Sequence, residues 1–148
     1  MRMRLLPSLP LYLLALLLAP LSAAAQDLLD PDEAFRATAR LVRADLIEVR
    51  YQTAPGYYLY RDRLAFALEP VEAILGKPKL PAGKTKHDEF FGKQVIYRHR
   101  TVVTVPVAAG SGIPLTLTAD LQGCADIGVC YPPVRRKFTL LPMPSPAR

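Results

Sequence analysis

The chain has 148 residues, with 19 basic and 13 acidic side chains, a formal net charge of +6, two cysteines and no tryptophan. The length fits one domain, and a small charge spread along the chain does not favour binding to nucleic acid. Even the densest basic cluster, Arg135-Arg136-Lys137, is better explained as a solvated strand face.

The first 25 residues have the three-part layout of a secretory signal peptide. Arg2 and Arg4 give a positive start, residues 11–18 are apolar and residues 22–25 are small, so cleavage is expected after Ala25. An uncleaved anchor is the alternative, but the apolar run is short for a membrane span. We therefore expect export to the periplasm, an oxidising compartment in which two cysteines are expected to form a disulfide.

The expected organisation is a signal peptide over residues 1–25, one folded domain over residues 26–141 and a Pro-rich tail or linker over residues 142–148. The domain should open with a capped single turn at Asp30-Pro31-Asp32-Glu33. Apolar and polar residues then alternate with the period of two that is typical of strands burying one face. The expected strands lie, in chain order, over residues 35–41, 47–52, 57–68, 97–107, 115–122 and 134–140. The stretch from Pro70 to Gly92 is rich in Pro, Gly and Lys and is expected to be mainly loop.

Six to eight short strands, with turn signals roughly every 8–12 residues and little helical periodicity, predict an all-β fold, an immunoglobulin-like β-sandwich. A small barrel is the alternative. The Cys…Trp…Cys core of antibody domains is absent, because the chain has no tryptophan. The two cysteines, Cys124 and Cys130, are too close in sequence to bridge distant strands, so the pair is expected at a hairpin end.

The two cysteines have the spacing C-x5-C. From 115 to 121 the odd positions are apolar, so an undisturbed strand would place Cys124 on the outward, polar face, whereas a bulge at Gly123 would reverse this. The intervening residues include Gly128 and can form a loop that returns the chain, which would bring the two Cα atoms within disulfide distance.

Such a disulfide would close a very small loop and remove little entropy from the unfolded chain, which makes it a poor structural staple. A redox role requires a thiolate that a partner sulfur can reach. Asp126 is the nearest ionisable neighbour in the sequence, and its carboxylate would disfavour a thiolate by like-charge repulsion. The residues favour a pair that is quiet until a partner docks, and they leave open a fixed bridge that only stiffens a hairpin.

Three segments together resemble one known family, the N-terminal periplasmic domain of the thiol:disulfide interchange protein DsbD. The cysteine segment, Gln122-Gly123-Cys124-Ala125-Asp126 through Val129-Cys130-Tyr131-Pro132-Pro133, resembles its active site. Residues 56–61 resemble its tyrosine-rich strand. Residues 88–93, followed by residues 96–98, resemble its cap loop. The segments keep the family's order and cover most of the chain after the signal peptide.

The resemblance implies an immunoglobulin-like fold in which Cys124 and Cys130 are the redox pair. It implies that Cys130 forms the mixed disulfide with partners and that Phe90 of the cap loop shields the pair. The remaining residues that the resemblance places near the site are Asp88, Glu89, Tyr58 and Tyr60. Each of these residues also has an ordinary explanation: the tyrosines as strand residues, Phe90 with its neighbour Phe91 as a hydrophobic plug, and the two acidic residues as solvated loop charges.

In that family, electrons pass from cytoplasmic thioredoxin through a membrane domain to a thioredoxin-like domain, which reduces the N-terminal domain. The N-terminal domain in turn reduces periplasmic disulfide isomerases and a cytochrome c maturation thioredoxin. The resemblance therefore implies a thiol:disulfide oxidoreductase with thioredoxin-like partners and no cofactor beyond its disulfide. Because residues up to Arg148 include neither the membrane nor the thioredoxin-like domain, we expect a stand-alone or truncated form, which a separate membrane electron conduit could serve.

Two rival functions stay open at the level of sequence. One is a secreted binding domain with an inert, structural disulfide. The other is a copper-binding module that uses both cysteines and a histidine, since thiolates suit Cu(I). No histidine lies within a few residues of the cysteines, and His87 and His99 are expected at the surface.

Overall fold

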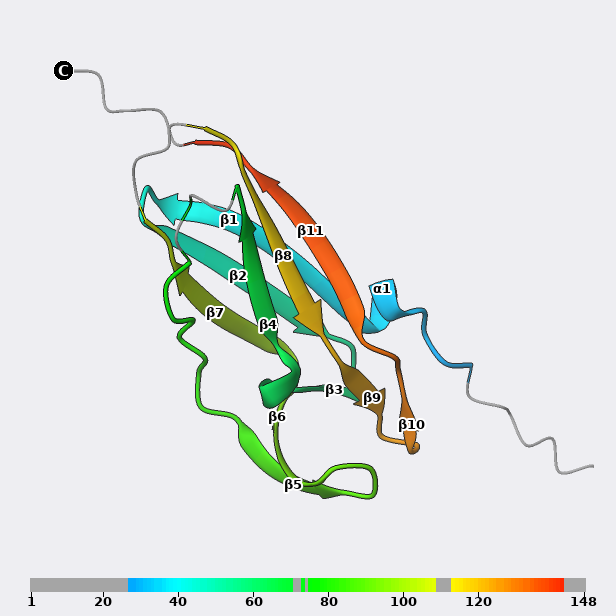
Figure 1. Cartoon of the computed structure of the whole chain (residues 1–148). Coiled ribbons are helices and arrows are strands. Elements are labelled where there is room, and N and C mark those ends of the chain that lie inside the picture. The colour runs from blue at the N-terminus through cyan, green and yellow to red at the C-terminus, as the bar shows by residue number, and fades with distance from the viewer. Residues whose placement is uncertain (1–26, 71–72, 74, 109–112, 143–148) are drawn as a thin grey trace, which may run out of the picture.

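The computed structural model describes residues 27–70, 73, 75–108 and 113–142 (Figure 1). The predicted signal peptide and nearly all of the predicted Pro-rich tail lie outside these residues. Within them, no helix is long and apolar enough to cross a membrane.

The described chain is built almost entirely of strands (Figure 1). A single helical turn, α1 (Pro31–Ala34), opens it, as predicted, with Pro31 in the first turn and the Asp30 backbone carbonyl accepting bonds from Glu33 and Ala34. The Asp30 side chain itself makes no capping bond. The strands are β1 (Phe35–Arg43), β2 (Leu46–Thr53), β3 (Tyr57–Tyr60), β4 (Ala65–Glu69), β5 (Lys84–Asp88), β6 (Gly92–Tyr97), β7 (Arg100–Pro106), β8 (Leu115–Leu121), β9 (Gly123–Ala125), β10 (Val129–Cys130) and β11 (Val134–Leu140).

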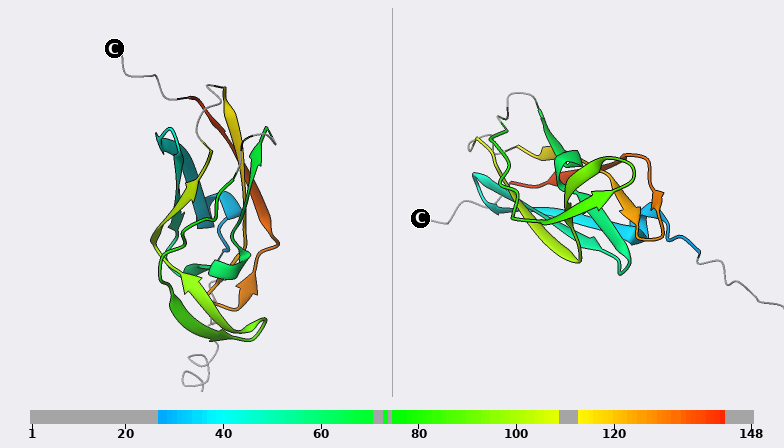
Figure 2. Two further views of the ribbon diagram at one scale, coloured as in Figure 1. Left: turned by 60° about the vertical axis from the view of Figure 1, so that its left-hand side comes forward. Right: turned by 90° about the horizontal axis from the view of Figure 1, so that it is seen from below.

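Two three-stranded sheets form the layers of a sandwich (Figure 2). One has the order β1-β2-β7 and the other β11-β8-β4, and all neighbouring strands are antiparallel. Alternate residues of β2, β7 and β8 point into the shared core, and the largest fully buried ones are Tyr51, Ile47, Val49, Val103, Val105, Leu117 and Leu121. The predicted all-β, immunoglobulin-like sandwich is confirmed.

A third sheet, with the order β10-β9-β3-β6-β5, lies at one end of the sandwich (Figure 1). It is formed where the chain leaves the main layers: β3 follows β2, and β9 follows β8 after Gln122. Because β9 pairs with β3, the segment that carries the cysteines is anchored to the end of both layers.

Three predicted elements differ from the structure. The expected loop 70–92 contains β5, whose polar sequence has no apolar alternation and which is a strand because it pairs with β6. The expected strand 97–107 is divided at Arg98-His99, where His99 has a positive φ of 57°. The expected run 57–68 is divided by the short 3-10 turn η2 (Arg61–Arg63), which sends β3 and β4 into different sheets.

Candidate redox site

The two cysteines lie directly opposite each other on β9 and β10 and form a disulfide, with a Cα–Cα distance of 4.0 Å. The three residues between the paired ends include Gly128, whose φ of 86° favours glycine. Its backbone N–H donates to the Ala125 carbonyl over 3.0 Å, which closes the turn. The predicted chain reversal is confirmed; residues 123–130 are called the cysteine hairpin below.

Gly123 is required by a close approach of the backbone. A Cβ at this position would lie 2.3 Å from the Tyr58 carbonyl oxygen and 2.6 Å from Cε1 of Phe35. Any larger residue would therefore push β9 away from β3 and from the core ring of Phe35. The glycine brings the cysteine hairpin tightly against the end of the sandwich.

Cys124 is fully buried, so the predicted outward position is wrong as a statement about exposure. The alternation of odd and even positions did place Cys124 outside the main core. Its apolar neighbours are Tyr58, Tyr60 and Ile96, which form a second and smaller cluster. That face of the strand is covered by tyrosines of β3, which the spacing along one strand does not show. Cys130, by contrast, is partly exposed.

Tyr60 is the side chain in direct contact with both sulfurs. Its hydroxyl lies 3.1 Å from Sγ of Cys124 and 3.7 Å from Sγ of Cys130. Disulfide sulfurs carry no hydrogen, so the hydroxyl is the donor. Burial, assisted by the neighbouring Asp88 carboxylate and by Tyr58, raises the pKa of Tyr60, which keeps this donor protonated.

Asp88 is a buried carboxylate that shapes the cap loop, residues 88–93. Its Oδ1 accepts the backbone N–H groups of Phe90 and Phe91 over 3.0 and 2.8 Å, while Oδ2 has no hydrogen-bond partner among the described residues. Burial alone would raise the pKa of Asp88, but the nearby Tyr60 hydroxyl and the two backbone donors outweigh it and lower that pKa. The cap loop is thus held by an ionised side chain.

The two phenylalanines of the cap loop differ in their contacts. The ring of Phe91 meets the Tyr60 ring edge-on, with centroids 5.2 Å apart, and the Arg63 guanidinium lies 4.7 Å from the Phe91 centroid. Phe90 is 51% exposed and has no ring partner among the described residues. Glu89 is exposed, and its side chain makes no hydrogen bond or ion pair to a described residue. Phe91 is not among the site residues predicted from the sequence, yet its ring packs against Tyr60.

Asp126 does not present an uncompensated negative charge to the sulfurs. Both of its carboxylate oxygens accept bonds from Arg98, over 2.8 and 2.6 Å, and this pairing lowers the pKa of Asp126. The Arg98 guanidinium and the Lys86 ammonium each lie 5.2 Å from the centroid of the Tyr58 ring. The expected repulsion between Asp126 and a thiolate is therefore weakened by cations that lie far away in the sequence.

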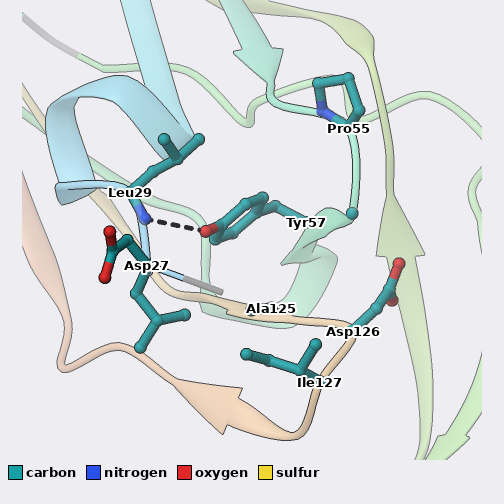
Figure 3. Close-up of a pocket in the computed structure, with 9 residues that line it drawn as sticks. Asp27, Leu29, Pro55, Tyr57, Ala125, Asp126 and Ile127 are labelled. Atoms are coloured by element: carbon teal, nitrogen blue, oxygen red, sulfur yellow. Dashed lines mark hydrogen bonds between the residues drawn. The ribbon is translucent and has the colours of Figure 1, made fainter. Parts of the chain in front are cut away.

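A cavity of about 520 Å³ adjoins the cysteine hairpin but contains neither cysteine (Figure 3). Figure 3 shows Leu29, Tyr57 and Ile127 around it, with the Leu29 N–H donating to the Tyr57 hydroxyl over 2.9 Å. In the part of the chain that the structure describes, no group of three or more His, Cys, Asp or Glu side chains is arranged to hold a metal ion.

The fold and the site define an immunoglobulin-like domain that carries a disulfide between two short strands at one end of the sandwich, outside the main core. The chain belongs to the family described as "Thiol:disulfide interchange protein DsbD, N-terminal", whose profile matches residues 25–142.

Relatives support this assignment over most of the chain. The chain is 43% identical to the thiol:disulfide interchange protein DsbD of Ralstonia nicotianae over 120 residues, which cover 80% of this chain and 20% of that protein. It is 41% identical to DsbD of Neisseria meningitidis over 116 residues, or 78% of this chain and 19% of that protein. The chain thus spans about a fifth of the length of these relatives.

Two solved structures share the fold. The N-terminal domain of DsbD from Neisseria meningitidis, in its reduced form, matches with a TM-score of 0.71 and 42% identity, covering 78% of this chain and 90% of that one. The complex between the N-terminal domains of DsbD and PilB from the same organism matches with a TM-score of 0.66 and 41% identity, covering 78% and 88%.

Proposed function

We propose that this chain is a periplasmic thiol:disulfide oxidoreductase that relays electrons between a thioredoxin-like donor and periplasmic acceptors. The acceptors are disulfide isomerases and a cytochrome c maturation thioredoxin. The observation that carries the proposal is the disulfide itself, which joins a buried cysteine to a partly exposed one at the end of the sandwich. Family membership supports exchange chemistry, the solved complex of a related domain with a PilB domain supports a protein partner, and the signal-peptide pattern supports export.

The exchange proceeds in two displacements at sulfur. In the reduced domain, the Cys130 thiolate attacks one sulfur of an acceptor disulfide, which forms a mixed disulfide and releases the other acceptor sulfur as a thiolate. The Cys124 thiolate then attacks Sγ of Cys130, closes the Cys124–Cys130 disulfide and releases the second acceptor thiolate. Two electrons pass to the acceptor, whose two thiolates take up the protons lost by the domain's thiols. A donor dithiol reverses both steps.

The two cysteines have different roles because their surroundings differ. Cys130 is partly exposed and lies on an edge strand next to Val129, itself exposed, so a partner sulfur can approach it. Cys124 is fully buried, and its sulfur accepts a hydrogen bond from the Tyr60 hydroxyl. It is therefore suited to leave when the disulfide is reduced and to resolve the mixed disulfide when the domain is oxidised. Hydrogen bonding to a sulfur favours its thiolate form.

The cap loop shields the pair in this proposal. Phe90 is the gate that a partner displaces, Phe91 holds the loop against Tyr60, and Asp88 fixes the loop backbone. Tyr58 covers Cys124 and carries two cations on its ring. Glu89, exposed on the same loop, is available to a docking partner.

Trapping with single cysteine variants tests the proposal. Cys124→Ser leaves Cys130 free to form a mixed disulfide that cannot be resolved, so a stable adduct with a thioredoxin-like protein is expected. Cys130→Ser should trap far less, because Cys124 is buried. Equal trapping by both variants would show that the roles are wrong. A reduction potential below about −300 mV, with no adduct, would instead indicate an inert structural bridge.

A further inference from the structure

Arg98 joins three segments around the cysteine hairpin. It follows β6, and its two terminal nitrogens donate to both carboxylate oxygens of Asp126, over 2.8 and 2.6 Å. The same guanidinium donates to the Tyr57 carbonyl over 3.2 Å and lies 5.2 Å from the ring centroid of Tyr58. One side chain therefore connects the corner before β7, the start of β3 and the loop of the hairpin.

The two cysteines depend on this connection to different degrees. Cys124 lies on β9, which pairs with β3 and is fully buried. Cys130 lies on β10, a strand of two residues whose only sheet neighbour among the described strands is β9. Apart from the disulfide and the β9–β10 pairing, the hairpin is held by the Asp126 N–H to the Gly56 carbonyl at 2.7 Å, by Arg98, and by Tyr131, which follows Cys130. The Tyr131 N–H donates to the Gly123 carbonyl over 3.0 Å, its hydroxyl donates to the Leu29 carbonyl over 2.5 Å, and its own carbonyl accepts the Gln122 side-chain amide over 3.1 Å.

We propose that Arg98, through its ion pair with Asp126, is a positioning residue that keeps Cys130 beside Cys124 in the reduced domain. This inference rests on the proposed exchange function. In the oxidised domain the covalent bond fixes the two sulfurs whether or not the ion pair is present. In the dithiol only non-covalent contacts keep the hairpin closed, so the ion pair raises the effective concentration of one thiol at the other.

The consequence is a shift in the redox equilibrium. Without the ion pair, the dithiol can sample open hairpins and gains entropy that the disulfide form does not gain. The reduced form is then favoured, and the reduction potential rises. Because the pair is partly exposed, with 30% and 43% of the two side chains accessible, the expected effect is modest. We expect about a threefold change in the equilibrium constant with glutathione, which corresponds to about 14 mV for a two-electron couple.

The experiment uses Arg98→Gln and Asp126→Asn in the full chain, each equilibrated with glutathione redox buffers. The two changes alter the local charge in opposite directions: one removes a cation and the other an anion. If local charge alone acted on the thiolates, the potentials would shift in opposite directions. If the ion pair positions Cys130, both potentials rise, and the double variant shifts no further than either single variant.

A matched control is available in the sheet formed by β11, β8 and β4. Arg135 donates to both carboxylate oxygens of Asp120, over 2.7 and 3.0 Å, in a pair that links β11 to β8. Arg135→Gln should leave the potential unchanged. A potential of Arg98→Gln equal to that of Arg135→Gln, or opposite shifts in the two site variants, would overturn the inference.

The outcomes also distinguish this inference from the proposed function. If the unmodified chain exchanges disulfides with glutathione but the reduction potentials of the Arg98 and Asp126 variants do not shift, only the positioning role is lost. If the unmodified chain does not exchange at all, the proposed function itself fails. Should Arg98→Gln not fold, Asp126→Asn removes the same pair from the exposed hairpin loop and gives the same readout.

Discussion

The Tyr60 hydroxyl lies 3.1 Å from Sγ of Cys124, and so a buried, protonated donor faces the sulfur of the fully buried cysteine. In the exchange proposed above, a donor thiolate attacks Cys130, and the sulfur that leaves is that of Cys124. The hydrogen bond is stronger to the departing thiolate than to the neutral disulfide sulfur, because negative charge develops on that sulfur in the transition state. The hydrogen bond therefore lowers the activation barrier for reduction of the disulfide. Tyr60 is thus placed to assist the reduction of the domain.

The first prediction follows from this contact. Tyr60→Phe keeps the ring but removes the donor, so reduction of the domain by a small dithiol should slow about tenfold, the effect of losing one hydrogen bond to a charged group. Tyr58→Phe is the comparison, since the Tyr58 hydroxyl makes no hydrogen bond to either sulfur. Stopped-flow measurement of the two variants at one pH checks this; equal rates for Tyr60→Phe and the unmodified chain would remove Tyr60 from the chemistry.

A second prediction concerns the cap loop. Phe90→Ala should make the reduced cysteines react several-fold faster with a small alkylating agent, because the exposed ring that we propose as the shield of the pair is removed. Phe91→Ala should also speed the alkylation, but for a different reason: it removes the ring packed on Tyr60 and loosens the cap loop. Mass spectrometry of timed alkylation measures both. Unchanged rates in Phe90→Ala would show that this ring is not the gate.

A third prediction concerns Gly123. An alanine there places a Cβ within 2.3 Å of the Tyr58 carbonyl oxygen, so Gly123→Ala should lower the free energy of unfolding by about 1–3 kcal/mol or more. Gly128→Ala meets no atom within 4 Å, and its cost of about 1 kcal/mol comes only from the positive φ. Denaturant unfolding of the oxidised variants gives both values. A larger loss in Gly128→Ala would contradict the steric role of Gly123.

A fourth prediction concerns the acid dependence of stability. The pKa of Asp88 is lower in the folded chain than its ordinary value of 3.8, so its contribution to stability is fully present above that value and is lost as the pH falls through the folded pKa. Asp88→Asn cannot titrate. The difference in unfolding free energy between the unmodified chain and this variant should therefore shrink as the pH falls below about 4.

Denaturant unfolding at a series of pH values measures this difference. Both proteins contain every other acidic residue, so the contributions of those residues to the pH dependence largely cancel. Glu89→Gln is the matched control, since Glu89 neighbours Asp88 but is exposed and makes no hydrogen bond or ion pair to a described residue. A difference for Asp88→Asn that stays constant with pH would mean that the ionised carboxylate does not hold the cap loop.

Local sequence predicted much of this molecule. Alternation of apolar and polar residues over 47–52 and 115–121 predicted β2 and β8, because the side chains of a strand point alternately to opposite faces whatever the strand pairs with. The return of the chain near Gly128 was also predictable, since a positive φ favours glycine. The three family segments added the pairing of Cys124 with Cys130, which the structure confirms.

Contacts between distant segments decided the rest. The polar sequence of β5 contains no pattern that predicts a strand, and β6 makes it one. Cys124 is buried because tyrosines of β3 cover the face that alternation assigned to solvent. Asp126 is neutralised by Arg98, 28 residues away. Periodicity reports which face a residue occupies, whereas burial, charge compensation and access to sulfur depend on what the fold places against that face.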